Sequence, residues 1–282
     1  MKISLALCTY NGEKYIEKQL NSILEQTVIP NEIIISDDRS TDNTISIIKR
    51  ILKKFNGVSG IYINDRNLGT IKNFEKAISL TTGDIIFLSD QDDIWLPNKI
   101  EKILIGFKQQ PKALLFFTNG NLIDENDINL ESTLWNKWNF ESVEREKWKN
   151  NKFAFKNLLK NNNKITGATV AFKKELKKNV LPIHVPNDYW HDTWLALHAS
   201  ALNGLFFIEE SLIKYRIHSN QQVGIPESIR TTTKSLNFIN SLTAYQYENK
   251  IRMKYPFRFS LKKHFLFSLK NFKREIRKNR LK

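Results

Sequence analysis

Three acidic residues are crowded into the segment FLSDQDDIWLPNKI, where Asp90, Asp92 and Asp93 directly follow an apolar run. Carboxylates this close repel one another, so their spacing suits a site that receives a positive group. Carboxylate oxygens are the hard ligands that Mg²⁺ and Mn²⁺ prefer, and such an ion can neutralise a diphosphate. The alternative is a turn that leads into a helix, whose N-terminus favours acids. That alternative fits Asp93, but it fits Asp90 and Asp92 together poorly, because they end a buried strand.

Other polar residues each allow a binding and a structural interpretation. Asp37 and Asp38 end the apolar run EIIISDD and could cap a helix near Ser40 or accept hydrogen bonds from a nucleobase or a ribose. Asp192, in WHDTW, could cap a helix or act as a general base, with its proton affinity adjusted by the tryptophans beside it. His218, in YRIHSN, could be structural or could bind a metal through its imidazole.

The elements that must position these residues alternate along the first hundred residues. Apolar runs predict strands over 3–10, 32–38, 60–65 and 84–90, and apolar residues at helical spacing predict helices over 12–26, 40–55 and 69–81. This alternation predicts a parallel sheet with helices on both faces, in which ligands bind beyond the carboxyl ends of the strands. The residues that follow three of the strands, 9–11, 36–38 and 89–92, are therefore expected to converge.

The usual phosphate-binding loops do not occur in this sequence. No G-x-G-x-x-G follows the first strand, and there is no Walker A motif. A diphosphate at this edge of the sheet would need another positive partner, and a divalent metal held by the acids would supply one.

The pattern is less regular from residue 112 onward. A strand and turn are expected over 113–124, a strand followed by a helix start over 165–176, and a helix over 190–202. Residues 204–224 are expected to form two strands and a polar loop.

Composition limits the class of protein. The 282 residues are 41% hydrophobic and include one cysteine, Cys8, which indicates a globular protein without an internal disulfide, as in a reducing compartment. The sequence has no apolar run of 18 residues, and its first residues suit a strand better than a signal peptide. The net charge is +15, and residues 251–282 hold twelve Lys or Arg against one acid, Glu275. A charge of this size fits nucleic acid, a membrane surface or an acidic substrate.

An ordered set of segments resembles the family 2 glycosyltransferases. These segments are LALCTYNGEKYIEKQLNSILEQT, IIISDDRSTDNT, NLGTIKNFEKAI, DIIFLSDQDDIWLPNKI, ITGATVAF, HDTWLALHA and YRIHSNQQVG. SDQDDIWLPNK together with HDTW and YRIHSN looks closest to the rhamnosyltransferase-like branch of bacterial O-antigen and capsule synthesis. The resemblance covers residues 1–225.

The resemblance implies an α/β GT-A fold, a nucleotide-diphospho-sugar donor and inversion at the anomeric carbon. It implies a catalytic domain over 1–225, with a nucleotide-binding half over 1–111 and an acceptor half over 112–225. The expected donor is dTDP-L-rhamnose or a UDP-hexose, and the expected acceptor is a glycan or a lipid-linked glycan.

The resemblance also implies residue roles. The nucleotide pocket would be lined by Thr9, Tyr10, Asn11 and Glu13, with Asp37 reading the base, Asp38 beside it, and Asn67 and Gly69 at the border. Asp90 would face the ribose or the metal, and Asp92 and His218 would complete the site for Mg²⁺ or Mn²⁺. Asp192 would be the catalytic base, and Gly167, Ala168, Trp190 and His191 would border the donor sugar or the acceptor.

The basic extension over 226–282 lies outside the resemblance. Its apolar residues recur at helical spacing, so one interpretation is an amphipathic helix on the anionic inner face of the cell membrane, which would make a cytoplasmic protein peripheral. The other interpretation is a solvated basic helix packed on the catalytic domain.

Three competing functions remain at this point. A sugar-phosphate nucleotidylyltransferase would need a Gly- and Lys-rich loop after the first strand, which CTYNGEKY does not resemble. A nucleic-acid-binding protein would need basic and aromatic residues together in the body of the chain, whereas the basic excess lies in the extension, so no nucleic acid is expected. A catalytically inactive sugar-nucleotide-binding relative is disfavoured by the presence of Asp90, Asp92, Asp192 and His218.

Overall fold

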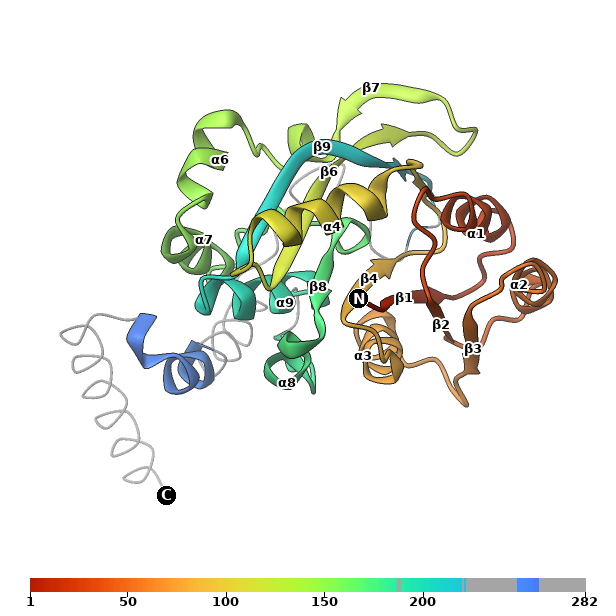
Figure 1. Ribbon diagram of the computed structural model, residues 1–282, viewed down its shortest axis with the longest axis horizontal. Helices are drawn as coiled ribbons and strands as arrows, with labels where there is room; N and C mark the ends of the chain where they lie inside the picture. The colour runs from red at the N-terminus through yellow and green to blue at the C-terminus, as the bar shows by residue number, and fades with distance from the viewer. Residues whose placement is uncertain (187–188, 220, 222–247, 259–282) are drawn as a thin grey trace, which may run out of the picture. The chain divides into compact units, whose positions relative to one another are not determined.

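The computed structural model describes residues 1–186, 189–219, 221 and 248–258 (Figure 1). The chain divides into two compact units, Met1–Arg230 and Thr231–Lys282. In the described part of the second unit, residues 248–254 are helical and lead into a 3₁₀ turn, Pro256–Arg258. The predicted boundary at residue 225 and the basic residues from 259 onward lie outside the described residues.

The first half of the first unit alternates strand and helix as the sequence predicts. Its elements are β1 (Ile3–Thr9), α1 (Ile16–Leu24), β2 (Glu32–Asp37), α2 (Thr44–Leu52), β3 (Val58–Ile63), α3 (Thr70–Leu80) and β4 (Ile85–Ser89). β1, β2 and β4 are buried along their whole length because apolar residues occupy both faces of each strand. These strands run parallel in the order β3-β2-β1-β4.

The second half adds a mixed region to the same sheet. Its strands are β5 (Ile94–Trp95), β6 (Leu115–Ile123), β7 (Asn129–Thr133), β8 (Ala171–Lys173) and β9 (Leu205–Arg216). Its helices are α4 (Lys99–Gln109), α5 (Leu134–Lys137), α6 (Ser142–Trp148), α7 (Asn151–Leu158), α8 (Lys177–Val180) and α9 (His191–Ala201), with 3₁₀ turns at Gly167–Thr169 and Lys174–Leu176. The described part of the sheet has nine strands in the order β3-β2-β1-β4-β8-β6-β9-β5, and β7 pairs with β6. β8 lies antiparallel between β4 and β6, whereas β6 and β9 are parallel.

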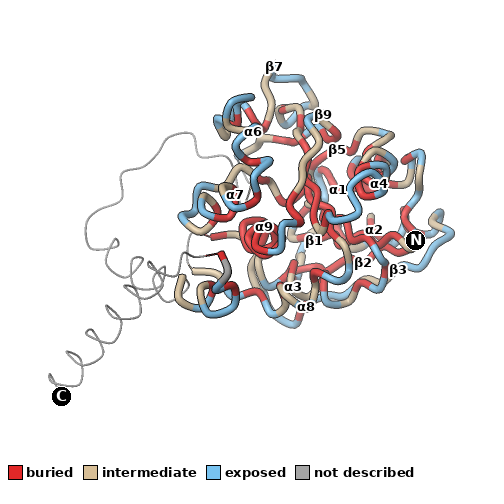
Figure 2. The backbone as a smooth tube through the Cα atoms, turned by 60° about the vertical axis from the view of Figure 1, so that its left-hand side comes forward, coloured by how far each residue is buried: buried red, intermediate tan, exposed pale blue. Residues whose placement is uncertain are grey.

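Helices cover the sheet on both faces. Because βαβ crossovers are right-handed, α1 and α2 lie on one face of the parallel region and α3 lies on the other. α9 packs against α3, β6 and β9 (Figure 1). Every residue of α9 is buried, as the red tube of Figure 2 shows, so its polar residues, Asp192 and His198 among them, lie inside the protein.

The structure differs from the predicted elements where polar side chains compete with the backbone. The helix predicted from residue 40 begins at Thr44, because the Ser40 hydroxyl bonds Asp37 and Asp42 accepts the Thr44 N–H at 3.0 Å. The two strands predicted over 204–224 form one twelve-residue strand, β9, whose register shifts opposite Asn119.

Candidate active site

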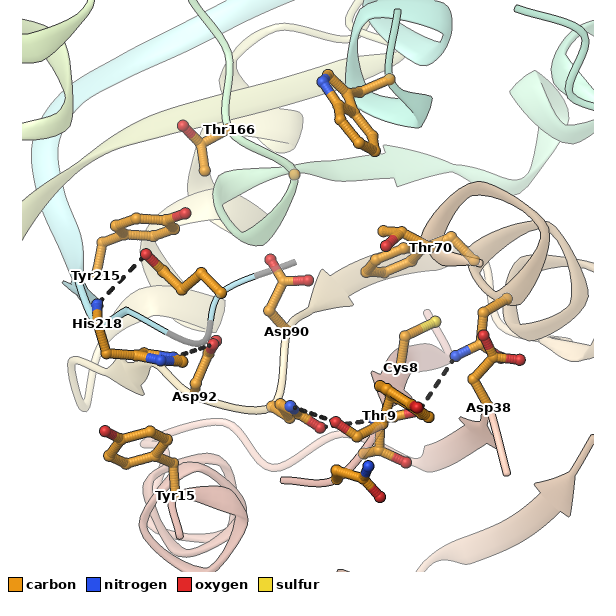
Figure 3. Close-up of a pocket in the computed structure, with 18 of the residues that line it drawn as sticks. Cys8, Thr9, Tyr15, Asp38, Thr70, Asp90, Asp92, Thr166, Tyr215 and His218 are labelled. Atoms are coloured by element: carbon orange, nitrogen blue, oxygen red, sulfur yellow. Dashed lines mark hydrogen bonds and ion pairs between the residues drawn. The ribbon is translucent and has the colours of Figure 1, made fainter. Parts of the chain in front are cut away.

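A cavity of about 430 Å³ lies at the carboxyl ends of the parallel strands. Most of the residues predicted to form the site line it: Thr9, Tyr10, Asn11, Asp38, Asp90, Asp92, Gly167, Trp190, His191, Asp192 and His218. These residues come from segments up to about two hundred positions apart in the sequence, so the fold brings together the ends of β1 and β4, the start of α9 and the end of β9 (Figure 3). The predicted convergence at the sheet edge is therefore present in the structure.

The acids after β4 occupy three different environments. Asp90 faces the cavity, and its carboxylate accepts no hydrogen bond from the described residues. Burial, together with the nearby charges of Asp92 and Asp192, raises the pKa of Asp90 to about 7. The Asp92 carboxylate lies 3.0 Å from Nε2 of His218. Asp93 does not line the cavity and accepts the backbone N–H of Arg216 at 3.1 Å, so its role is structural, but it joins the loop to β9 and is not at the start of a helix as expected.

Arg216 binds the backbone of the acidic loop, residues 90–93. Its side chain is fully buried, and its Nε donates to the backbone carbonyl of Asp92 at 2.7 Å. Another guanidinium nitrogen donates to the carbonyl of Asp124 at 3.0 Å and pairs with the carboxylate of Asp127 at 2.5 Å. The same residue therefore ties the end of β9 to the acidic loop and to the turn between β6 and β7.

A buried lysine, Lys99, supports a turn whose first residue, Gly167, lines the cavity. Lys99 is fully buried, its ammonium donates to the carbonyl of Ala168 at 2.6 Å, and it lies 3.7 Å from the centre of the Trp95 ring. Burial lowers the pKa of Lys99 well below its usual range. Ala168 lies in the 3₁₀ turn Gly167–Thr169, so Lys99 fixes the turn that borders the site, while Ala168 itself is not among the residues lining the cavity.

Asp192 lies in the first turn of α9, where its carboxylate is buried and hydrogen-bonded. It accepts bonds from the Thr193 N–H at 2.5 Å and from Nδ2 of Asn163 at 3.1 Å, and the backbone N–H of Gly167 also contributes. Burial raises the pKa of Asp192 to about 6, and the hydrogen bonds oppose part of that increase. A carboxylate with this pKa can accept a proton from a hydroxyl group near neutral pH.

His191 is a neutral, stacked side chain in the cavity wall. Its ring stacks on Phe74 with centroids 4.0 Å apart, and burial lowers its pKa to about 3. The ring abuts Gly167 so closely that a Cβ there would lie 2.6 Å from Nε2 of His191. Gly167 is therefore required by the close approach of the histidine.

The two adjacent acids at the end of β2, Asp37 and Asp38, accept hydrogen bonds from other parts of the protein. Asp38 lines the cavity, and its carboxylate accepts the backbone N–H groups of Leu68 at 2.7 Å and Gly69 at 2.8 Å. Asp37, which the resemblance assigns to the base, is fully buried, does not line the cavity, and accepts the Thr9 hydroxyl at 2.7 Å. Asp37 thus positions the end of β1 in this structure.

Glu13, Asn67 and Gly69 also lie outside the cavity lining. Glu13 accepts the backbone N–H of Asn43 at 2.9 Å, which helps to start α2. Asn67 accepts the N–H of Gly69 at 3.1 Å, and Gly69 has a φ of 77°, a conformation that glycine adopts without strain. Asn67 and Gly69 shape the loop before α3.

Several cavity residues were missed by the sequence interpretation. Gln91 lies inside the acidic motif and exchanges two hydrogen bonds with the backbone of Tyr10, at 2.8 and 3.0 Å, so its position in the motif was a usable signal. Tyr15, Thr166 and Tyr215 also line the cavity, and their place in segments of the family resemblance was a usable signal as well. Glu125 lines the cavity too, but it comes from a segment without such a signal.

The cavity contains side chains of the types that bind a divalent metal ion. Asp90 and Asp92 offer carboxylate oxygens and His218 offers an imidazole nitrogen, and Asp90 has an unused carboxylate. Among the described residues, no three His, Cys, Asp or Glu side chains are gathered closely enough to hold an ion. In this geometry Asp92 is paired with His218 and Asp90 stands apart.

Known proteins share this sequence pattern over most of the chain. The family model described as glycosyl transferase family 2 matches residues 4–180. An uncharacterized glycosyltransferase of Nostoc sp. is 26% identical over 95% of this chain and 81% of its own length. The dTDP-rhamnosyl transferase RfbG of Shigella flexneri is 29% identical over 83% of this chain and 79% of its own length.

Solved structures share the fold. S. aureus TarS (residues 1–349, in complex with UDP) superposes with a TM-score of 0.57 at 18% identity, over 77% of this chain and 61% of that one. The mannosyltransferase PcManGT of Pyrobaculum calidifontis, solved with GDP-Man and Mn²⁺, gives a TM-score of 0.52 at 17% identity, over 88% and 64%. The chain thus spans less than two thirds of the length of either solved protein. With the matched family model, the shared α/β fold and the cavity at the sheet edge, the chain belongs to glycosyl transferase family 2.

Proposed function

We propose that the protein is an inverting, metal-dependent glycosyltransferase that takes a sugar from a nucleotide-diphospho-sugar and adds it to a hydroxyl group of a glycan. The observation that carries this proposal is that Asp90, Asp92 and His218 line the same cavity as Asp192. One group of residues suits a divalent cation beside a diphosphate, and the other suits a general base.

The protein's own residues account for the chemistry. Asp192 accepts the proton of the acceptor hydroxyl while that oxygen bonds to the anomeric carbon. The bond from the anomeric carbon to the phosphate oxygen breaks on the opposite face, and its electron pair leaves with the nucleoside diphosphate. One displacement inverts the stereochemistry. A Mg²⁺ or Mn²⁺ ion held by Asp90, Asp92 and His218 would stabilise the negative charge of the departing diphosphate.

The donor that we propose is dTDP-L-rhamnose, with a UDP-hexose as the alternative, and the acceptor is a glycan or lipid-linked glycan of a bacterial surface polysaccharide. The support is the named activity of the Shigella flexneri relative, at 29% identity over 83% of this chain. The uridine diphosphate bound to TarS supports a pyrimidine nucleotide more generally.

Thermal denaturation with UDP, dTDP, GDP and ADP, each with Mn²⁺ and with EDTA, tests donor binding. A ligand that binds only the folded state raises the melting temperature. We expect one pyrimidine diphosphate to raise it in Mn²⁺ and not in EDTA. A panel without any nucleotide-dependent change would contradict the proposal.

Two substitutions separate binding from chemistry. Asp92→Ala should abolish the metal-dependent rise in melting temperature, because it removes a ligand of the cation. Asp192→Asn should retain that rise and abolish sugar transfer, because an amide cannot accept the proton. Normal turnover by Asp192→Asn would show that another group is the base.

A further inference from the structure

Tyr215 is a buried residue of the cavity wall to which neither the motifs nor the proposed chemistry assigns a role. It is the next-to-last residue of β9, its side chain is 6% exposed, and it lines the cavity. Figure 3 shows its hydroxyl directed into the cavity between Thr166 and Asp90. It therefore lies between the metal-binding side chains and the turn that borders Asp192.

The hydroxyl of Tyr215 forms no hydrogen bond with any described residue. The neighbouring carboxylates are engaged elsewhere or face the cavity: Asp93 accepts the Arg216 N–H, and Asp92 pairs with His218. Buried polar groups in native proteins are nearly always paired, so an unpaired hydroxyl that opens into a cavity is a feature that a ligand would satisfy.

Burial and the surrounding carboxylates together keep the Tyr215 phenol protonated. Burial raises its pKa well above the usual range, and the charges of Asp93, Asp90, Asp92 and Asp192 act in the same direction. The phenol therefore keeps its proton and presents both a donor and an acceptor. A neutral group with both capacities matches a sugar hydroxyl, which also donates and accepts.

We propose that the Tyr215 hydroxyl is a specificity-determining contact of this enzyme, hydrogen-bonded to an oxygen of the transferred sugar. The inference rests on the proposed function, because it needs a nucleotide-sugar in the cavity. It goes further by assigning the neutral hexose or deoxyhexose ring, and not the diphosphate, to the space between Asp90 and the Gly167–Thr169 turn.

The experiment compares the wild-type chain of 282 residues with Tyr215→Phe, which removes one hydroxyl and keeps the ring. The probes are nucleoside diphosphates alone, by calorimetric titration with Mn²⁺, and the matching nucleotide-sugar, by steady-state turnover. We expect kcat/KM for the nucleotide-sugar to fall about 10- to 100-fold, because the sugar oxygen is left without its hydrogen-bond partner in a buried site. The Kd of the nucleoside diphosphate should stay within about twofold of the wild-type value.

Melting temperatures provide the structural control. Replacing an unpaired buried hydroxyl by hydrogen is neutral or stabilising, so Tyr215→Phe should melt no lower than the wild type. Tyr189→Phe is the matched control for folding, because its hydroxyl donates to the Leu159 carbonyl at 3.1 Å and its loss should lower the melting temperature.

Three outcomes would overturn the inference. A lower melting temperature for Tyr215→Phe, as in the Tyr189 control, would mean that the hydroxyl has a structural partner. An equal loss of affinity for the nucleoside diphosphate would mean that it contacts phosphate, and an unchanged kcat/KM would mean that it contacts no part of the substrate. If the wild-type protein binds no nucleoside diphosphate at all, the proposed function fails, and this inference fails with it.

Discussion

The carboxylate of Asp192 is balanced between burial, which favours its neutral form, and hydrogen bonds, which favour its charged form. Because its pKa is raised to about 6, the fraction of enzyme with an ionised base falls about tenfold for each pH unit below 6. We expect kcat/KM to rise with pH up to about 6 and to level off above it. A rate profile over pH 4.5–8 measures this. A profile that stays flat down to pH 4.5 would contradict the assignment of the base.

Asn163 offers an independent test of the same carboxylate. Its amide donates to Asp192 at 3.1 Å and lowers the pKa of that group by stabilising the charged form. Removing the amide should therefore raise the pKa, and the acidic limb of the rate profile for Asn163→Ala should move above that of the wild type. A purely structural role would lower the rate equally at every pH and leave the limb in place.

At the residue scale, the sequence signals were strongest where chemistry and spacing coincide. The acids after β4 are crowded in the sequence itself, so their convergence with other strand ends could be predicted from the parallel-sheet pattern. Asp37 shows the limit of this reasoning, because the sequence cannot tell which of two adjacent acids turns inward. Tyr215 lies in the YRIHSN segment, but the sequence assigns it no role there, and the pairing of β9 with β6 places it beside the cavity.

Among the elements, the start of β2 depends on one buried acid. Glu32 accepts hydrogen bonds from the Ser4 hydroxyl and from the backbone N–H of Thr82, the latter at 2.7 Å, which joins β2 to β1 and to the turn before β4. Burial alone would raise the pKa of Glu32, but these bonds outweigh it and lower the pKa to about 2. The ionised form is therefore part of the stable fold.

This depressed pKa predicts how stability depends on pH. The contribution of Glu32 is fully present above the unfolded-state pKa of about 4.5 and is lost as the pH falls towards 2. The difference between the two pKa values corresponds to about 3 kcal/mol. We expect Glu32→Gln to lower the free energy of unfolding by about that amount at pH 7 and by much less at pH 3. Urea denaturation at both pH values measures it, and an equal loss at both would contradict the electrostatic cause.

The helix α4 supports the site through Lys99. Lys99→Met would leave the Ala168 carbonyl without its donor, so we expect a loss of about 2–4 kcal/mol in the free energy of unfolding. Because the Gly167–Thr169 turn also supplies a hydrogen bond to Asp192, kcat should fall as well. Lys102→Met is the matched control on the same helix, since its pair with Glu210 is exposed and should contribute at most about 1 kcal/mol. Equal effects of the two substitutions on stability would contradict the assigned role of Lys99.

The predicted elements agree best with the structure where hydrophobic pattern alone decides the outcome. The four strands and three helices of the first half were predicted because each strand is apolar on both faces and each helix has one apolar face. Helix starts were predicted less well, because Asp42 and Glu13 engage backbone groups that a pattern cannot assign. The strand expected within 165–176 is present as the short β8, but its antiparallel pairing with β4 and β6 could not be predicted from three residues.

For the molecule as a whole, the positive charge is unevenly distributed along the sequence. Among the described residues, no helix is long and apolar enough to cross a membrane. Residues 259–282 hold nine Lys or Arg and one acid, Glu275. An anionic membrane surface attracts each nearby basic residue with about 1 kcal/mol at physiological ionic strength. We propose that this extension holds the enzyme at a membrane surface that carries a lipid-linked acceptor.

A chain ending at residue 258 tests this proposal, because it removes the basic segment and leaves the cavity residues in place. We expect the full chain to sediment with vesicles containing anionic lipid and to be released as salt rises, since screening weakens surface electrostatics. The shortened chain should remain in the supernatant, and neither chain should bind vesicles of neutral lipid. Both chains should turn over a soluble acceptor at similar rates, whereas a lipid-linked acceptor should be used faster by the full chain. Equal sedimentation of the two chains would show that the extension does not bind the membrane, and equal binding to neutral vesicles would show that charge is not the cause.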